Sequence, residues 1–345
     1  MVPRPETTGS FPGDHGGSLD HARALFADAP EPWIDLSTGI NPHSYPVFEL
    51  PAKALTRLPE PGRVARLAAL AAAAYEARSP DHVVVSPGTQ PLLPLIAGLR
   101  PAGLARILGP TYSEHGRCAA LAGHRVETVP DPALLAEADL GVVVNPNNPD
   151  GRLIEADDLR TLAQDLERHG GLLLVDEAFM DVAPQGHSLA GDLGAGNIVV
   201  LKSFGKFYGL AGLRLSFAIA TEAVADRLRA ALGPWPVSGP ALEYGLCALA
   251  DRDWQIATRK QIFADAERLA ALLTGSGLES VGGTGLFRLV RHEEAGMLFS
   301  HLGRAGILAR AFADRPQCLR FGLPGGDAEW RRLNNALVRW MERAA

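Results

Sequence analysis

The segment from Ser203 to Arg214 carries the side chains best suited to chemistry. Lys206 lies in a glycine-rich turn shortly after an apolar run that ends at Leu201. Partial desolvation there favours a neutral amine, which can form an imine with an aldehyde. The hydroxyl of Ser203 and the guanidinium of Arg214 lie on either side of the lysine and could converge on one phosphate group. This segment therefore predicts that Lys206 holds a phosphorylated aldehyde.

Asp176 and Asn148 each follow an apolar run. Asp176 comes directly after residues 172–175, and Asn148 lies in the turn 145–151, which follows residues 142–144. Ligand contacts in α/β proteins lie at the carboxyl ends of buried parallel strands, so Asp176 is a candidate ligand-binding carboxylate. A helix N-cap is the alternative interpretation of this aspartate. By composition alone the asparagine segment is only a turn.

Residues 86–90 lie between the apolar run 83–85 and a helical pattern. Free N–H groups at a helix N-terminus favour phosphate, which makes Gly88, Thr89 and Gln90 candidate phosphate contacts. Many loops in α/β proteins have the same order of strand, glycine and helix. The segment is therefore weak evidence by itself.

The elements that must position these residues alternate regularly from about residue 62. Helical patterns separate several short apolar runs, which lie at residues 83–85, 106–108, 141–144, 172–175, 198–201 and 215–219. This alternation predicts an α/β fold with a mainly parallel sheet covered by helices on both faces.

The pattern changes at residues 233–236, where prolines and a glycine break the chain. A long helical stretch follows at about 239–273, and then come strand-like runs at 285–290 and 318–321 and a closing helix from Asp327. We expect a smaller α+β C-terminal domain here. The predicted division is an N-terminal arm at 1–50, a large domain at 51–232 and a small domain at 233–345.

Composition excludes several classes of function. The formal net charge is −6 and there is no basic block of five or more residues, so the sequence shows no cluster of positive charge that would bind nucleic acid. We expect no membrane span and no signal peptide, because no apolar stretch approaches the roughly 18 residues that a span needs and the N-terminus lacks an apolar core. Three cysteines lie far apart without metal-ligand spacing, which favours a reducing cytoplasm and no metal site.

The lysine segment resembles that of the fold-type I pyridoxal 5′-phosphate (PLP) enzymes, specifically the histidinol-phosphate aminotransferase branch. The resemblance implies a large domain with a seven-stranded, mainly parallel sheet, a small C-terminal domain, an N-terminal arm and a homodimer. It implies a Schiff base between PLP and Lys206, with Asp176 keeping the pyridinium protonated as an electron sink. It assigns the cofactor's ring oxygen to Asn148 and its ring face to Tyr112. The implied phosphate contacts are Ser203, Arg214, Gly88, Thr89 and Gln90.

Residues 15–17, 33–42 and 233–240 are similar to those of the threonine-phosphate decarboxylases of cobalamin biosynthesis. This likeness implies conversion of L-threonine O-3-phosphate, a small phosphorylated amino acid, to (R)-1-amino-2-propanol O-2-phosphate. The implied substrate contacts are His15, Gly39, Asn41, Arg310 and Arg320. Arg320 lies inside an apolar strand-like run, where an unpaired guanidinium would be costly.

Two positions depart from the family's pattern. Phe179 stands where many relatives have a tyrosine that hydrogen-bonds the cofactor's ring oxygen. Leu58 stands where relatives often have a tyrosine that reaches the phosphate in the neighbouring subunit. A dimer is still expected, but these two hydrogen bonds are missing or replaced.

Two other functions are compatible with the same motifs. A histidinol-phosphate-type aminotransferase would share the fold and the cofactor but break a different bond at the substrate α-carbon. A non-catalytic PLP-binding regulatory module would normally carry an additional DNA-binding domain. A Rossmann dehydrogenase is excluded because the opening G-x-G-x-x-G is missing.

Overall fold

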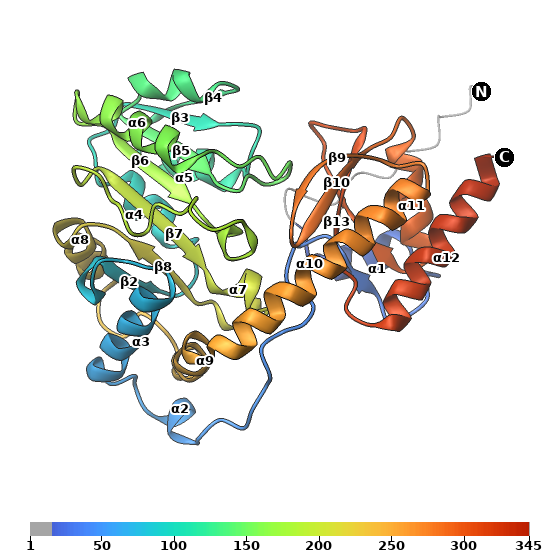
Figure 1. Cartoon of the computed structure of the whole chain (residues 1–345), viewed down its shortest axis with the longest axis horizontal. Helices are drawn as coiled ribbons and strands as arrows, with labels where there is room; N and C mark the ends of the chain where they lie inside the picture. The colour runs from blue at the N-terminus through green and yellow to red at the C-terminus, as the bar shows by residue number, and fades with distance from the viewer. Residues whose placement is uncertain (1–15, 345) are drawn as a thin grey trace, which may run out of the picture. The chain divides into compact units, whose positions relative to one another are not determined.

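A computed structural model describes residues 16–344 of the chain (Figure 1). These residues form two compact units: residues 43–262, here the large unit, and the described residues up to 42 together with those from 263 onward, here the small unit. Helix α10 (Arg252–Gly275) contains the boundary and contributes to both units. The division into an arm, a large domain and a small domain that the sequence suggests stays a prediction.

A seven-stranded sheet with the order β2-β8-β7-β6-β5-β3-β4 lies in the large unit (Figure 1). The pairs among β3 to β7 are parallel, whereas β8 is antiparallel to both β2 and β7. The predicted mainly parallel sheet is therefore confirmed. Its strands are β2 (Val83–Ser86), β3 (Leu104–Leu108), β4 (Arg125–Val129), β5 (Leu140–Val144), β6 (Leu172–Asp176), β7 (Ile198–Ser203) and β8 (Ser216–Ile219).

The large unit also contains helices α2 (Lys53–Thr56), α3 (Pro61–Ala74), α4 (Leu92–Ala97), α5 (Glu114–Leu121), α6 (Ala156–Glu167), α7 (Phe204–Phe207), α8 (Glu222–Leu232) and α9 (Gly239–Ala250). Short 3-10 turns are η1 (Pro80–His82), η2 (Pro132–Glu137), η3 (Met180–Val182) and η4 (Ala211–Leu213).

Helices cover both faces of this sheet. Leu174 and Ala218 belong to one core cluster with residues of α4, α5 and α8. Gly141 faces α6, and Phe217 packs against Tyr75, which ends α3. Because successive strand residues point to opposite faces, these two sets lie on opposite sides of the sheet. Double coverage explains why every residue of β5 and β6 is buried.

The long helical stretch predicted at 239–273 is in fact two helices, α9 and α10. Asp251 takes a non-helical conformation and ends α9. Its carboxylate accepts a hydrogen bond of 3.0 Å from the backbone N–H of Trp254 in the first turn of α10. The aspartate therefore caps the second helix. Its side chain hydrogen-bonds the backbone in place of a continuing helical bond, and the spacing of apolar residues does not reveal this break.

The small unit contains a four-stranded antiparallel sheet with the order β12-β13-β10-β9 and a parallel pair formed by β1 and β11. Its strands are β1 (Ile34–Asp35), β9 (Glu279–Thr284), β10 (Phe287–Arg291), β11 (Ile307–Leu308), β12 (Arg310–Ala311) and β13 (Cys318–Gly322). Its helices, besides part of α10, are α1 (Leu19–Leu25), α11 (Ala295–Arg304) and α12 (Asp327–Ala344). This is the predicted α+β unit. It also contains β9 and three two-residue strands that the sequence did not indicate.

Three absences bear on function and refer only to residues 16–344. In this range no helix combines the length and the apolar character needed to cross a bilayer. No group of three or more histidine, cysteine or acidic side chains there is placed to hold a metal ion. Cys118, Cys247 and Cys318 are free thiols.

Candidate active site

The predicted cofactor residues gather at one edge of the seven-stranded sheet because their strands end there. Strands β5, β6 and β7 are parallel, and β2 runs in the same direction because both β2 and β7 are antiparallel to β8. Ser86 at the end of β2 and Ser203 at the end of β7 are both register partners of Ser216 on β8. Asp176 ends β6, which lies next to β7. This edge is where open α/β sheets bind ligands.

Lys206 is held by a short turn of helix at the end of β7. Phe204 and Phe207 on either side of it are fully buried and anchor α7. A Cβ atom at Gly205 would lie 2.8 Å from the Cα atom of Ala211, so only glycine lets the chain fold back here. Lys206 itself is half-buried. Its Nζ lies 5.4 Å from the ring centroid of Phe179, so the phenylalanine that replaces the family's tyrosine contacts the amine by a cation–π interaction.

The other lysines of the chain occupy different environments. Lys202 is buried and donates hydrogen bonds to Glu177 Oε2 at 2.5 Å and to Ser188 Oγ at 3.1 Å. Lys53 and Lys260 are exposed. Lys206 is thus the half-buried lysine at the carboxyl edge of the sheet.

Asp176 is fixed by a residue that the sequence did not indicate, His115. The Nε2 atom of His115 lies 2.9 Å from Asp176 Oδ2, and both side chains are buried. Within the described chain, the other ring nitrogen of His115 is buried without a hydrogen-bond partner. A proton there would be unsatisfied, so the geometry assigns the neutral tautomer with its proton on Nε2, donated to the carboxylate. The backbone N–H of Ala178 donates to the second oxygen of Asp176 at 3.1 Å.

Two sequence features of His115 become informative only once its contact with Asp176 is known. It lies three residues after Tyr112, and the two rings meet edge to face with centroids 5.8 Å apart. It is also a polar residue on the face of α5 that carries buried Cys118 and Ala119. Neither observation identifies Asp176 as its partner, which lies 61 residues further along the chain.

Gly88 and Arg214, two predicted phosphate contacts, are in direct proximity. Gly88 has a φ of +93°, and a Cβ atom built there would lie 2.7 Å from Nη2 of Arg214. Arg214 has the left-handed conformation, with φ 53° and ψ 56°, which is strained for a residue with a side chain and is typical of functional sites. The guanidinium therefore packs directly against the backbone at Gly88.

A buried hydroxyl adds to this cradle. Among residues 16–344, the Oγ atom of Ser216 is buried without a hydrogen-bond partner. It lies between the strands that end in Ser86 and Ser203. Ser86 is already engaged, since its hydroxyl donates to the carbonyl of Gly88 at 3.0 Å. A phosphate group fits this combination of a guanidinium, the glycine backbone at position 88 and serine hydroxyls.

Thr89 and Gln90 have partners away from this cradle. The side-chain amide of Gln90 donates to Glu114 on α5, which also pairs with Arg117. Thr89 is half-buried, and its carbonyl accepts from the backbone N–H of Leu92 at 3.0 Å, which starts α4. Their roles as phosphate contacts stay predictions.

Tyr112 and Asn148 lie on two loops that are fastened together. Asn147 accepts a hydrogen bond from the Thr111 hydroxyl at 2.6 Å and donates to the carbonyl of Pro110 at 3.0 Å. Asn147 therefore shapes the turn, and its two hydrogen bonds fix the half-buried Asn148 relative to Tyr112.

The electrostatic surroundings of Tyr112 connect it to the residues above. Burial raises the pKa of Tyr112 to about 12, with further contributions from Glu114 and Asp176, and Arg214 acts in the opposite direction. The phenol therefore stays neutral at physiological pH. Asp176 and Arg214 both lie close enough to influence it, so the structure brings these three predicted residues together.

The predicted substrate residues belong to the small unit. Arg320 is 5% exposed, its guanidinium donates to the carbonyl of Ser37, and its Cζ lies 4.9 Å from the ring centroid of Phe287. Arg310 is its direct cross-strand partner on β12. The pKa of Arg320 is lowered to about 9, mainly by burial and also by the neighbouring Arg310, while Asp35 opposes the shift. Two cations on paired strands repel each other, and together they are suited to binding an anion.

The remaining substrate candidates lie near the same strands. Gly39 has a φ of +61° and Asn41 is 1% exposed. The backbone N–H of Gly17 donates to the hydroxyl of Ser37 at 2.7 Å, so the glycine pair that follows position 15 lies beside a residue that binds Arg320. His15 itself lies outside the described residues.

Comparisons with known proteins agree with this arrangement. Residues 62–336 match the family described as Aminotransferase class I and II. The chain is 45% identical over 333 residues to a threonine-phosphate decarboxylase from Sinorhizobium sp, covering 96% of this chain and 99% of that protein. It is 39% identical over 334 residues to a threonine-phosphate decarboxylase from Pseudomonas aeruginosa, with the same coverage.

Solved structures share the fold at lower identity. The histidinol-phosphate aminotransferase from Sinorhizobium meliloti, in complex with pyridoxal 5′-phosphate, superposes with a TM-score of 0.81 at 23% identity, covering 100% of this chain and 99% of that chain. The L-threonine-O-3-phosphate decarboxylase from Porphyromonas gingivalis has a TM-score of 0.72 at 20% identity, with 98% of both chains covered.

Proposed function

The chain belongs to the family of class I and II aminotransferases, and on that basis we propose that it is a PLP-dependent threonine-phosphate decarboxylase. It converts L-threonine O-3-phosphate to (R)-1-amino-2-propanol O-2-phosphate, a step of cobalamin biosynthesis. The observation that carries this function is the 45% identity to a threonine-phosphate decarboxylase over 96% of the chain.

The residues at the sheet edge fit PLP. Lys206 would hold its aldehyde carbon, Asp176 its ring nitrogen, and Arg214, Ser203 and the backbone at Gly88 its phosphate. The unsatisfied hydroxyl of Ser216 and the close approach of Arg214 to Gly88 support this fit. When bound, PLP supplies an electron sink for the pair released at the substrate α-carbon.

The side chains of the protein have separate tasks around this group. His115 donates to Asp176 and so keeps the carboxylate oriented. Tyr112, as a neutral phenol, would pack on the ring face, and Asn148 would donate to the ring oxygen. Lys206 Nζ is the proposed donor of the proton that returns to the α-carbon after carbon dioxide leaves.

Arg310 and Arg320 are the proposed anchors for the anionic groups of the substrate. L-Threonine O-3-phosphate carries a carboxylate and a phosphate, and two guanidinium groups on paired strands can serve both. Gly39, Asn41 and His15 are further proposed substrate contacts. When both anions of the substrate are held, the protein determines which bond at the α-carbon is oriented for cleavage. A decarboxylase breaks the bond to the carboxylate, whereas an aminotransferase breaks the bond to hydrogen.

We also propose that the enzyme acts as a homodimer in the cytoplasm. The segment before α3 exposes Val47, Leu55 and Leu58, which are 77%, 72% and 62% exposed. Apolar side chains gathered on one short segment are typical of a surface that a partner covers. Three free cysteines are consistent with a reducing compartment.

Incubation of the PLP-loaded protein with L-threonine O-3-phosphate tests the function. We expect stoichiometric release of carbon dioxide and formation of aminopropanol phosphate, identified by mass spectrometry. Lys206→Ala should abolish both turnover and the visible absorbance of the bound cofactor, whereas the exposed Lys260→Ala should change neither. Amino transfer from histidinol phosphate to 2-oxoglutarate without release of carbon dioxide would instead indicate an aminotransferase. Cofactor binding without any turnover would indicate a regulatory module.

A further inference from the structure

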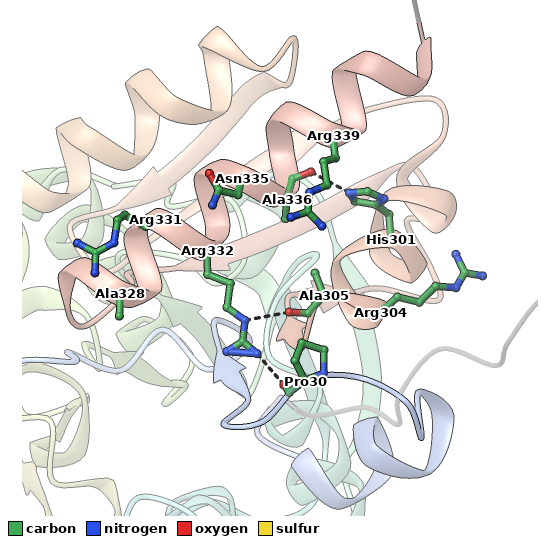
Figure 2. Close-up of a pocket in the computed structure, with 10 residues that line it drawn as sticks. All are labelled: Pro30, His301, Arg304, Ala305, Ala328, Arg331, Arg332, Asn335, Ala336 and Arg339. Carbon is green, nitrogen blue, oxygen red and sulfur yellow. Dashed lines mark hydrogen bonds between the residues drawn. The ribbon is translucent and has the colours of Figure 1, made fainter.

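The small unit contains a cavity that no residue of the proposed active site lines. Its volume is about 540 Å³, and its walls come from α11, α12 and the segment that precedes β1 (Figure 2). The lining includes His301 and Arg304 of α11 and Arg331, Arg332 and Arg339 of α12. We call this cavity the arginine pocket.

The lining of the arginine pocket is strongly cationic on a chain whose net charge is −6. Among the described residues that line it, none is acidic and His301 has the only aromatic ring. Four guanidinium groups line this one cavity, and an anion bound among them would reduce the repulsion between their charges.

Arg332 forms the centre of the wall and is fixed by the backbone. It donates to the carbonyls of Ala305 at 3.0 Å, Pro32 at 2.6 Å and Pro30 at 2.6 Å. Figure 2 shows Arg331 and Arg304 extending outward on opposite sides of it. Arg332 therefore closes the base of the pocket.

The other arginines of the pocket differ from the neighbouring arginine on the same helix. Arg343, one turn beyond Arg339, pairs with Glu294 at 2.8 Å. Arg304, Arg331 and Arg339 are exposed and form no ion pair with any residue in the described range 16–344. Within residues 16–344 their charges are thus not paired with an acidic side chain, and their side chains can rotate towards a ligand.

Helix periodicity places these groups on one face. Arg331, Asn335 and Arg339 follow at intervals of four residues, so their side chains line up along α12. His301 on α11 is held against this face because its Nε2–H donates to the carbonyl of Ala336 at 2.8 Å. The two helices therefore both contribute cationic side chains to the lining of the pocket, and α12 adds one amide (Figure 2).

We propose that the arginine pocket binds a compact polyanion with two or more phosphate groups. Guanidinium groups bind phosphate oxygens in pairs, and several of them suit a ligand with several phosphates. The volume lies within the roughly 300–1,000 Å³ of small-molecule sites. With a single ring in the lining, the pocket offers little stacking surface for a nucleobase, so the phosphates provide the recognition. This binding does not depend on the decarboxylase function.

Isothermal titration calorimetry of the PLP-loaded protein with inorganic tripolyphosphate, at constant ionic strength, tests the proposal. We expect saturable binding that the double variant Arg331→Ala/Arg339→Ala weakens at least tenfold. The control Arg66→Ala/Arg291→Ala removes two exposed charges outside the pocket and should leave the affinity within twofold. Inorganic monophosphate should bind at least tenfold more weakly than tripolyphosphate.

Three results would overturn the proposal: no saturable binding to the parent protein, equal loss in the control variant, or unchanged affinity in the pocket variant. Equal affinities for monophosphate and tripolyphosphate would overturn the requirement for several phosphates. The single variant Arg339→Glu serves as a second probe if the double variant is unstable, and it should also weaken binding at least tenfold. Decarboxylation of threonine phosphate by the pocket variant should be intact, which separates this test from that of the catalytic function.

Discussion

The pair formed by Asp176 and His115 is the residue-scale feature with the most direct catalytic consequence. A carboxylate at the end of a buried strand could rotate, and this would weaken its hold on a pyridinium. The hydrogen bond from His115 Nε2 and the bond from the backbone of Ala178 restrict this rotation. His115 is therefore a positioning residue that acts through Asp176.

We predict that His115→Leu lowers kcat for threonine phosphate by roughly 10- to 100-fold, because a hydrogen bond to a charged group contributes about 1.5–3 kcal/mol. KM should change little, and the absorbance spectrum of the bound cofactor should shift. His115→Gln retains a donor near the Nε2 position and should recover part of the rate. Equal losses in both variants with an unchanged spectrum would show that the ring serves packing only.

Several site residues could be predicted from the sequence because their chemistry depends on residue type and on the end of a strand. Lys206, Asp176 and Arg214 are of this kind, and the structure places them at one edge of the sheet. His115 could not be predicted, because its importance rests on a contact across 61 residues. Nor does any local pattern show that Gln90 donates to Glu114 rather than remaining available to a phosphate.

Strands β6 and β7 are joined at their carboxyl ends by a buried ion pair between Glu177 and Lys202. Glu177 also accepts from the Ser188 hydroxyl at 2.6 Å and from the backbone of Leu189 at 2.8 Å. These contacts saturate the carboxylate, which is necessary for a charge that is fully buried. The pair fixes the spacing of the two strands that carry Asp176 and Lys206.

We predict that Glu177→Leu destabilises the protein by about 3–5 kcal/mol, because it leaves the ammonium of Lys202 buried without its partner. The double variant Glu177→Leu/Lys202→Met removes both charges and should recover most of this loss. Urea unfolding of Glu177→Leu, Lys202→Met and the double variant measures the coupling between the two positions. If the losses of the two single variants simply add in the double variant, the predicted coupling is wrong.

Asp181 in η3 is half-buried beside the same region and gives a pH-dependent prediction. Burial raises the pKa of Asp181, with Lys202 and Arg259 opposing, and its Oδ2 has no hydrogen-bond partner in the described part of the chain. A raised pKa in the folded state means that ionisation of Asp181 costs stability at neutral pH. The cost disappears as pH falls towards the ordinary value of 3.8.

We therefore expect Asp181→Asn to have a higher free energy of unfolding than the parent protein near pH 8, and the difference to shrink as the pH is lowered towards the ordinary carboxyl pKa of 3.8. Urea unfolding at a series of pH values measures this trend. A difference that is the same at every pH would show that ionisation of Asp181 is not its cause.

At the scale of elements, the sequence predicts what depends on periodicity. The central strands are continuous apolar runs, and each appears in the sheet. The sequence does not show that β8 is antiparallel, because a buried strand has the same composition in both directions. The two-residue strands β1, β11 and β12 are too short to have a pattern, and their pairing follows from tertiary contacts.

At the scale of the whole molecule, the exposed leucines of residues 43–60 lead to a prediction about assembly. Leu55→Asp/Leu58→Asp places two charges on the proposed dimer surface and should convert a dimer to a monomer. Light scattering after size-exclusion chromatography measures the mass. Leu121→Asp alters a leucine on α5 that is 69% exposed and should leave the dimer intact. A dimer that persists in the double variant would place the interface elsewhere.

The burial of Lys202 has a chemoselective consequence. Its amine lies only four residues before Lys206, and an aldehyde reacts with whichever amine is unprotonated and within reach. Glu177 and Ser188 bind the Lys202 amine inside the protein, so the folded chain withholds this competitor from the aldehyde. A vitamin-derived aldehyde that enters the site then meets a single reactive nitrogen.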